Sequence, residues 1–242
     1  FNYNQEMEHD ACGVGLIAST NGKKSRKIVE LGIKALKAIW HRGAVDADGK
    51  SGDGAGIQIE IAPDFFKDKI IASGQTPDET KRICVGMVFL PRTNYADQEK
   101  CREIIESILL EENYHIYGWR QVPFNSNVLG STAERSRPEI AQVMFKKNEI
   151  LKTNDLERDL FETRKKIEKL ARENQLRNFY ICSFSSRSIV YKGMFLAEML
   201  AEFYPDLNDK KLTSRFAIFH QRYSTNTFPS WDLAQPFRTL AH

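Results

Sequence analysis

The chain has 242 residues, and its composition of 41% hydrophobic and 28% charged residues is typical of a folded globular protein. Its 35 basic and 32 acidic residues nearly balance to a formal charge of +3, and no dense Lys/Arg block favours a nucleic-acid partner. No apolar run reaches the ~20 residues that cross a bilayer, and residues 1–11 lack the basic start and apolar middle of a signal peptide. We therefore expect a cytoplasmic protein that binds neither nucleic acid nor a membrane.

The cysteines are too widely spaced to predict a disulfide framework or an iron–sulfur site. They stand at Cys12, Cys84, Cys101 and Cys182, without a C-x-x-C pair. His9 and Cys12 form a single H-x-x-C, and nothing nearby completes a zinc site. We expect free thiols in a reducing compartment and no metal.

The chain opens with a predicted strand and a predicted helix. Small and apolar residues over 12–19 predict a buried strand, which the turn residues Asn21-Gly22 end. From Ser25 onward, apolar residues recur at helical spacing and predict a helix that stops near Trp40.

A glycine-dense stretch follows over residues 41–56. Glycine permits positive φ and close approach of the backbone to another group, so we expect a tight structural loop near a site. Gly52-x-Gly54-x-Gly56 departs from the G-x-G-x-x-G pattern and precedes a strand, predicted over 56–61. A dinucleotide site is therefore not favoured.

The rest of the chain is predicted to form runs of strands with helices between the runs. Strands are expected at 83–90, 114–122, 141–145, 179–185, 188–191 and 216–220, the fourth and fifth pairing as a hairpin. Helices are expected at 97–110, 155–175 and 195–203, with Cys101 in the core, and a loop is expected at 123–138. Such runs favour an α+β or layered α/β/β/α fold over a doubly wound parallel sheet.

Cys12 is the first candidate for chemistry. If residues 1–11 are removed, it becomes an N-terminal residue that carries both a thiol and a free α-amine. A free thiol has a pKa of about 8.5 and needs a base at neutral pH, and an α-amine of pKa ~7.7–8.0 can take its proton. The alternative is a buried strand cysteine without a chemical role.

A polar segment from Phe219 to Trp231 is the second candidate. It carries Arg222 followed by Tyr-Ser-Thr-Asn-Thr. A planar guanidinium suits bidentate binding of a carboxylate, and hydroxyls or an amide can complete the clamp. A solvated surface arginine is the alternative.

Six motifs gather these candidates into one pattern. They are Cys12-Gly13-Val14-Gly15, Trp40-His41-Arg42-Gly43-Ala44-Val45-Asp46-Ala47-Asp48-Gly49, Gly52-Asp53-Gly54-Ala55-Gly56, Tyr117-Gly118-Trp119-Arg120, Tyr191-Lys192-Gly193-Met194 and His220-Gln221-Arg222-Tyr223-Ser224-Thr225-Asn226-Thr227-Phe228-Pro229. Together they resemble the amino-terminal glutaminase domain of glutamate synthase large subunits, a class II glutamine amidotransferase domain of the N-terminal-nucleophile superfamily. The likeness runs from Cys12 to His242, and residues 40–49 most resemble the bacterial NADPH-dependent enzymes.

The resemblance implies a fold and a set of roles. It implies a four-layer α/β/β/α sandwich in which Cys12 attacks the side-chain amide of glutamine. A γ-glutamyl thioester forms, ammonia leaves, and water releases glutamate. Arg42 matches the family's loop arginine near the nucleophile. Arg222, Thr225 and Asn226 match the segment that binds the α-carboxylate end of glutamine.

The resemblance also implies cofactors and partners beyond this chain. Ammonia would pass to a flavin domain of the large subunit, where 2-oxoglutarate is converted to glutamate with FMN and an iron–sulfur cluster. NADPH and FAD would act through a small subunit. We expect no cofactor within these 242 residues. The expected partners are glutamine, the remaining large-subunit domains and the small subunit.

Two departures from the family pattern set the expected domain boundaries. In the family the catalytic cysteine begins the mature chain, so we expect residues 1–11 to be a propeptide-like leader and residues 12–242 to be an amidotransferase domain. The family's oxyanion-hole Asn-Gly would follow His242, so this domain is expected to be incomplete at its C-terminal end. Loss of an oxyanion donor costs about 10²–10³-fold in rate, so we expect the chain as written to be weak or inactive.

Two other functions stay open from the sequence. One is a catalytically silent glutamine-binding or assembly module, and the other is a different N-terminal-nucleophile amidohydrolase such as an acylase. Glutamine turnover by a chain that begins at Cys12 would exclude the silent module. Selective labelling of Cys12 by a glutamine-like electrophile would separate the second.

Overall fold

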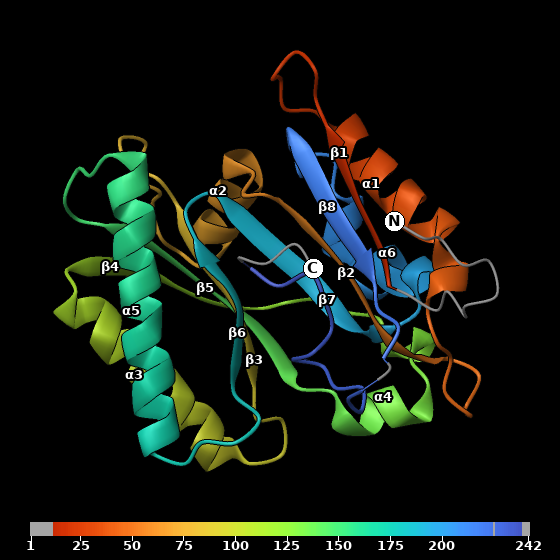
Figure 1. The fold of residues 1–242 in the computed structure, drawn as a ribbon. Helices are drawn as coiled ribbons and strands as arrows, with labels where there is room; N and C mark the ends of the chain where they lie inside the picture. Colours follow the sequence, from red (N-terminus) through yellow and green to blue (C-terminus); the bar gives the residue numbers. More distant parts are fainter. Residues whose placement is uncertain (1–11, 225, 239–242) are drawn as a thin grey trace, which may run out of the picture.

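The computed structural model describes residues 12–224 and 226–238 of the chain. Within these ranges the chain forms two four-stranded sheets and six α-helices (Figure 1). The strands of both sheets pair in antiparallel fashion. The α+β composition expected from runs of strands is therefore confirmed.

Strand order differs from chain order in both sheets. The first sheet runs in the order β1 (Gly13–Ala18), β8 (Phe216–Gln221), β2 (Ser51–Glu60) and β7 (Ser188–Phe195). The second runs in the order β4 (Tyr114–Gln121), β5 (Glu139–Lys147), β3 (Cys84–Leu90) and β6 (Tyr180–Ser185). The helices are α1 (Arg26–Ala38), α2 (Pro63–Ala72), α3 (Tyr95–Glu111), α4 (Ser131–Ser136), α5 (Thr153–Glu173) and α6 (Leu200–Phe203). Short 3₁₀ helices lie at Trp40–Arg42, Ser126–Val128, Ala197–Met199 and Pro205–Asn208.

Four predictions of local structure were wrong. The strand expected to be buried over 12–19 is exposed on one face, where Val14 and Leu16 of β1 are 45% and 62% exposed. Residues 51–56 belong to β2 rather than to a loop, because the glycine run pairs with β7 across a bulge between Ser51 and Ala55. The predicted loop at 123–138 contains α4, whose single polar turn carries no periodic signal. The predicted hairpin does not form, since β6 pairs with β3 and β7 with β2. The chain therefore crosses from one sheet to the other between these two strands.

Strand β3 has hydrophobic neighbours on both of its faces. Met87 and Phe89 belong to a cluster that includes side chains of β2, β8 and α1. Val88 and Leu90 belong to a second cluster with side chains of α3 and α5. Side chains alternate across a strand, so this division follows from the pleat. Cys101 lies in the second cluster, as predicted.

Helix α1 lies close to the first sheet at a buried glycine. A Cβ placed on Gly32 would lie 2.6 Å from the Cβ of Ala217 in β8. Figure 1 shows α1 beside β1 and β8, with α3 and α5 beside the second sheet. The amphipathic pattern that predicted α1 therefore reflects packing on the first sheet.

The described residues contain neither a helix that could span a membrane nor a cluster of metal-binding side chains. None of the helices in residues 12–224 and 226–238 is both long and apolar enough to cross a membrane. Over the same ranges, no group of three or more His, Cys, Asp or Glu side chains is arranged to hold a metal ion.

Ile57 provides a test of the hydrophobic core. Its side chain is fully buried in the cluster between β2 and its neighbours, so Ile57→Ala removes buried apolar contacts and leaves a cavity. We expect the free energy of unfolding to fall by about 2–5 kcal/mol in urea denaturation. Ile150→Ala is the matched control, since that side chain is 83% exposed. Equal effects of the two changes would contradict the packing described here.

Candidate active site

Three strands meet at one end of the first sheet. Gly13 at the start of β1 pairs with Gln221 at the end of β8, and Gln221 pairs on its other side with Ala55 of β2. These pairings fix the register of β1 against β8. Cys12, immediately before β1, therefore lies beside the residues that follow β8.

The thiol of Cys12 lies against the backbone of Tyr223. Its Sγ donates to the carbonyl oxygen of Tyr223 at 3.5 Å and accepts from the Tyr223 N–H at 3.3 Å. Cys12 is half-buried, so the sulfur is held by the backbone without being enclosed in the core. This residue stands at the entry to a strand rather than inside it.

The other three cysteines are unsuited to nucleophilic chemistry. All four cysteines lie in the described ranges, and Cys84, Cys101 and Cys182 are buried. Burial raises the pKa of the Cys101 and Cys182 thiols to about 12 and raises that of Cys84 further. Because the thiolate is the nucleophile, these three are expected to stay inert while Cys12 can react.

Arg42 lies next to the candidate nucleophile. It ends the 3₁₀ helix that follows α1, and it is half-buried. Its stem covers Gly13, because a Cβ on that glycine would lie 3.1 Å from the Cβ of Arg42. The structure thus brings together two of the residues singled out from the sequence.

Arg222 is buried rather than solvated. Its guanidinium donates to Thr227 Oγ1 at 2.5 Å and to the backbone carbonyl of Asp53 at 3.3 Å. Its backbone N–H donates to the carbonyl of Gly54 at 2.8 Å. Burial raises the pKa of the Asp53 carboxyl, although the Ser224 N–H and the Arg222 charge oppose that rise. The Arg222 side chain is therefore held in place, one residue before the Tyr223 backbone that contacts the Cys12 sulfur.

The other two predicted site residues occupy the loop after Arg222. Thr225 lies outside the described residues. Asn226 is described and is exposed. This loop is closed by a hydrogen bond from the Ser224 hydroxyl to the carbonyl of Thr227, so Asn226 lies between two bonded positions.

The segment between Arg42 and β2 is anchored by Asp48. Its carboxylate accepts from the Ser51 hydroxyl at 2.6 Å, from the Ser51 N–H at 2.7 Å and from the Thr132 N–H at 3.1 Å. These bonds hold the pKa of Asp48 well below its usual value, and the bond from the Ser51 hydroxyl has the largest effect. The segment is therefore tied to the first turn of α4.

The glycines of β2 make room for the C-terminal segment 231–238. A Cβ on Gly54 would lie 2.7 Å from the Cβ of Ala234, and one on Gly56 would lie 2.5 Å from the carbonyl oxygen of Gln235. Gly54 also has a φ of 131°, which other residues rarely adopt. The expected close approach of the backbone to another group is therefore observed, although within a strand.

Lys192 of β7 holds this C-terminal segment in place. Its buried Nζ donates to the carbonyl oxygens of Asp232 and Ala234, each at 2.7 Å. It also lies 4.4 Å from the ring centre of Tyr180 and 5.0 Å from that of Phe237. Burial lowers the pKa of this amine to about 8. The ammonium is thus satisfied mainly by backbone carbonyls and aromatic faces.

Asp53 and Lys192 were missed by sequence reasoning. Asp53 is the one acidic residue within Gly52–Gly56, and Lys192 is the one charged residue in β7. An isolated charge in a strand of small or apolar residues signals a buried polar group that needs partners. That signal was available from the sequence, but it did not name the partners.

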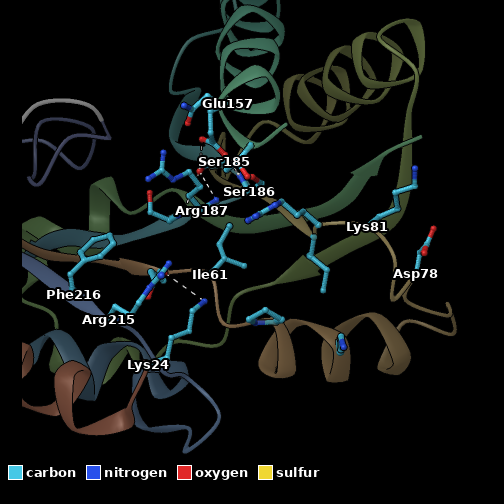
Figure 2. Close-up of a pocket in the computed structure, with 18 of the residues that line it drawn as sticks. Lys24, Ile61, Asp78, Lys81, Glu157, Ser185, Ser186, Arg187, Arg215 and Phe216 are labelled. Atoms are coloured by element: carbon cyan, nitrogen blue, oxygen red, sulfur yellow. Dashed lines mark hydrogen bonds and ion pairs between the residues drawn. The ribbon is translucent and has the colours of Figure 1, made fainter. Parts of the chain in front are cut away.

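A separate cavity of about 850 Å³ lies at the opposite end of the first sheet (Figure 2). Glu60 and Phe216, the far ends of β2 and β8, help to line it, and Cys12 does not. Much of its charge is already matched, since Glu60 pairs with Arg215 at 2.6 Å and Glu157 accepts hydrogen bonds from two serines. This cavity is not part of the candidate site.

The chain belongs to the class II glutamine amidotransferases. That family matches residues 12–242, which is the whole chain from Cys12 onward. The family resemblance predicted from the six motifs is therefore confirmed.

The chain is also similar to glutamate synthases from several organisms. It is 56% identical over 240 residues to the glutamate synthase [NADPH] large chain of Azospirillum brasilense, covering 99% of this chain and 16% of that protein. It is 44% identical over 240 residues to the ferredoxin-dependent glutamate synthase of Pyropia yezoensis, covering 98% and 15%. With the chloroplastic ferredoxin-dependent enzyme of Oryza sativa subsp. japonica it shares 41% identity over 236 residues, covering 97% and 15%. The chain thus spans about a sixth of the length of these relatives.

The buried Lys192 makes the free energy of unfolding depend on pH in a way that can be tested. Its pKa is about 8 in the folded chain against an ordinary 10.5, so between these values the unfolded chain binds more protons. The free energy of unfolding contributed by Lys192 should therefore rise with pH across this window, by roughly 3 kcal/mol in all. Urea unfolding of the wild type and of Lys192→Met at pH 7, 8.5 and 10 measures this as a growing difference. If the two proteins differ in unfolding free energy by the same amount at all three pH values, the burial of a charged amine is contradicted.

Proposed function

We propose that this chain is the glutaminase part of a glutamate synthase large chain, and that Cys12 releases ammonia from the side chain of glutamine. The observation that carries this proposal is the position of the half-buried Cys12 Sγ, 3.3 Å from the Tyr223 nitrogen. Arg42 packs on Gly13, the residue after Cys12, and the buried Arg222 directly precedes Tyr223 in the chain. The similarity to three glutamate synthases supports the extension to the whole protein.

The reaction proceeds through a thioester. The sulfur of Cys12 attacks the carbonyl carbon of the glutamine side chain, and the S–C bond forms as the carbonyl oxygen takes up negative charge. The C–N bond then breaks, and the nitrogen leaves as ammonia with the proton that the thiol gave up. Water cleaves the γ-glutamyl thioester, which releases glutamate and restores the thiol. The α-amine of Cys12 carries the proton between these groups.

We assign substrate binding to the arginines and to the loop after Arg222. Arg222 binds the α-carboxylate of glutamine, because a planar guanidinium matches a carboxylate with two parallel hydrogen bonds. Thr225 and Asn226 complete that clamp. Arg42 lines the site on the other side of Cys12. The burial of Arg222 beside the Asp53 backbone supports its role, since a held guanidinium loses little freedom on binding.

The proposed architecture is a four-layer α/β/β/α sandwich over residues 12–242, preceded by a leader over residues 1–11 that lies outside the described residues. Packing of α1 against β8 and of α3 and α5 against β3 supports the layers. The leader must be removed because a nitrogen acylated by Ala11 is an amide and cannot act as a base. The N-terminal residue of the protein isolated from its source tests this. Cys12 in first position supports the leader, and an N-terminus that precedes Cys12 contradicts its removal.

In the whole protein we expect the ammonia to aminate 2-oxoglutarate on a separate flavin domain with FMN and an iron–sulfur cluster. NADPH and FAD would act through a small subunit, which the 56% identity to an NADPH-type large chain supports over a ferredoxin donor. The remaining large-subunit domains are further partners. We assign the protein to the cytoplasm.

Cys12→Ala tests the nucleophile. In the full-length protein it should lower glutamine hydrolysis by about 10³-fold or more, because the sulfur that forms the thioester is removed. The fold should survive, since the change removes one half-buried sulfur. Cys101→Ala, in the interior of α3, is the control and should retain hydrolysis.

A glutamine analogue that carries a chloromethyl ketone gives a second readout of the same assignment. Mass spectrometry should find the label on Cys12 alone of the four cysteines. Equal labelling of Cys84, Cys101 and Cys182 would argue against a privileged nucleophile. Binding of glutamine without turnover by a chain that begins at Cys12 would favour the silent binding module.

Arg222→Lys tests the carboxylate clamp. Lysine keeps the charge but lacks the planar fork, so we expect KM for glutamine to rise by roughly 10–100-fold with a smaller change in kcat, since hydrogen bonds to charged groups contribute about 1.5–3 kcal/mol. Steady-state kinetics of the full-length protein measure the split. An unchanged KM would remove Arg222 from the binding site.

A further inference from the structure

One peptide group links the Cys12 sulfur to a carboxylate. The Tyr223 carbonyl oxygen accepts from Cys12 Sγ at 3.5 Å. The N–H of Ser224 belongs to the same peptide plane and donates to Oδ2 of Asp53. Because a peptide is planar and its N–H and C=O point in opposite directions, fixing one end fixes the other. Asp53 therefore controls the orientation of the group that contacts the thiol.

The surroundings of Asp53 suit this task. It lies in the β-bulge of β2, between the register pairs Ser51–Phe195 and Ala55–Gly193, and bulges redirect side chains near functional sites. Its side chain is buried, and its backbone carbonyl accepts from the Arg222 guanidinium. The peptide before Tyr223 is bound as well, since the Arg222 carbonyl accepts from the Gln221 side chain. Both peptide groups that flank Tyr223 are thus bonded on the side away from the sulfur.

We propose that Asp53 is a positioning residue for the Cys12 nucleophile, acting through the Tyr223–Ser224 peptide. This inference rests on the proposed glutaminase function, for which the sulfur must meet the amide carbon of glutamine at a fixed angle. Asp53 touches neither substrate nor sulfur. Its acceptor oxygen holds the Tyr223–Ser224 peptide, and the carbonyl of that peptide lies against the thiol. The N–H that also contacts the sulfur belongs to the preceding Arg222–Tyr223 peptide. A change in the position of a reacting atom by about 1 Å can cost 10²-fold in rate.

An acceptor role predicts a definite difference between two substitutions. Asp53→Asn keeps an oxygen that can accept from the Ser224 N–H, whereas Asp53→Leu has a similar shape and no acceptor. In the full-length protein we expect the Asn variant to retain kcat for glutamine hydrolysis within about 3-fold. The Leu variant should lose 10-fold or more in kcat with KM changed by less than about 3-fold. Asp64→Asn is the control, because that aspartate is exposed in the first turn of α2.

The alkylation of Cys12 by iodoacetamide adds a readout that needs no glutamine. Followed by mass spectrometry across pH 6 to 10, it should show a lower midpoint for the Leu variant than for the Asn variant, because the Tyr223 carbonyl, which accepts from the thiol and repels a thiolate, is no longer held against the sulfur. Buried Cys84, Cys101 and Cys182 report folding, since they stay unlabelled in an intact chain. Absence of turnover in the wild type would refute the proposed function, while this alkylation comparison would still test Asp53.

Three results would overturn the assignment. Loss of kcat by 10-fold or more in Asp53→Asn would mean that charge, and not the acceptor, matters. An effect confined to KM would mean that Asp53 acts on substrate binding through Arg222. Equal kcat and equal alkylation midpoints for the Asn and Leu variants would mean that Asp53 does not set the orientation of the Tyr223–Ser224 peptide. The Asn variant can still overturn the assignment if the Leu variant fails to fold.

Discussion

The register of β8 between β1 and β2 is the constraint on which the candidate site depends. Gln221 pairs with Gly13 on one side and with Ala55 on the other, and its side chain accepts from the Ala197 N–H at 2.7 Å. A slip of one residue would turn every side chain of β8 to the opposite face. It would also move Tyr223 away from the Cys12 sulfur. Backbone pairing therefore decides where the chemistry takes place.

Much of the site is made of backbone atoms, which explains its glycines. A Cβ on Gly43 would lie 2.2 Å from the Gln221 side-chain nitrogen, and one on Gly52 would lie 2.9 Å from the carbonyl of Phe195. The main chain of β2 can thus approach β7 and the C-terminal segment closely, and Gly43, which precedes β2, leaves room for the Gln221 side chain of β8. This close packing has an energetic consequence. Polar groups such as Asp53 and Lys192 are enclosed, so each needs a partner at hydrogen-bond distance.

The sequence predicted the residues that differ chemically from their neighbours, and it failed on those whose role depends on distant partners. Cys12, Arg42 and Arg222 stood out by type and motif, and the structure brings them to one end of one sheet. Asp53 could not be assigned in this way, because its partner Ser224 lies 171 positions away. The false hairpin has the same origin, since short strands next to each other in sequence do not reveal which sheet they join. Local periodicity predicts elements, whereas pairing across the chain assembles the site.

The pairing of β1 has a consequence for how the protein is made. Within the described residues β1 pairs with β8 alone, and Cys12 and Tyr223 are separated by 211 positions. At a synthesis rate of about 5–20 residues per second, the strand after Cys12 waits roughly 10–40 s for its partner to leave the ribosome. Contacts of this separation also slow folding, because a long loop must close before they form. The contact between the thiol and Tyr223 can therefore form only after every strand of the second sheet has been synthesised.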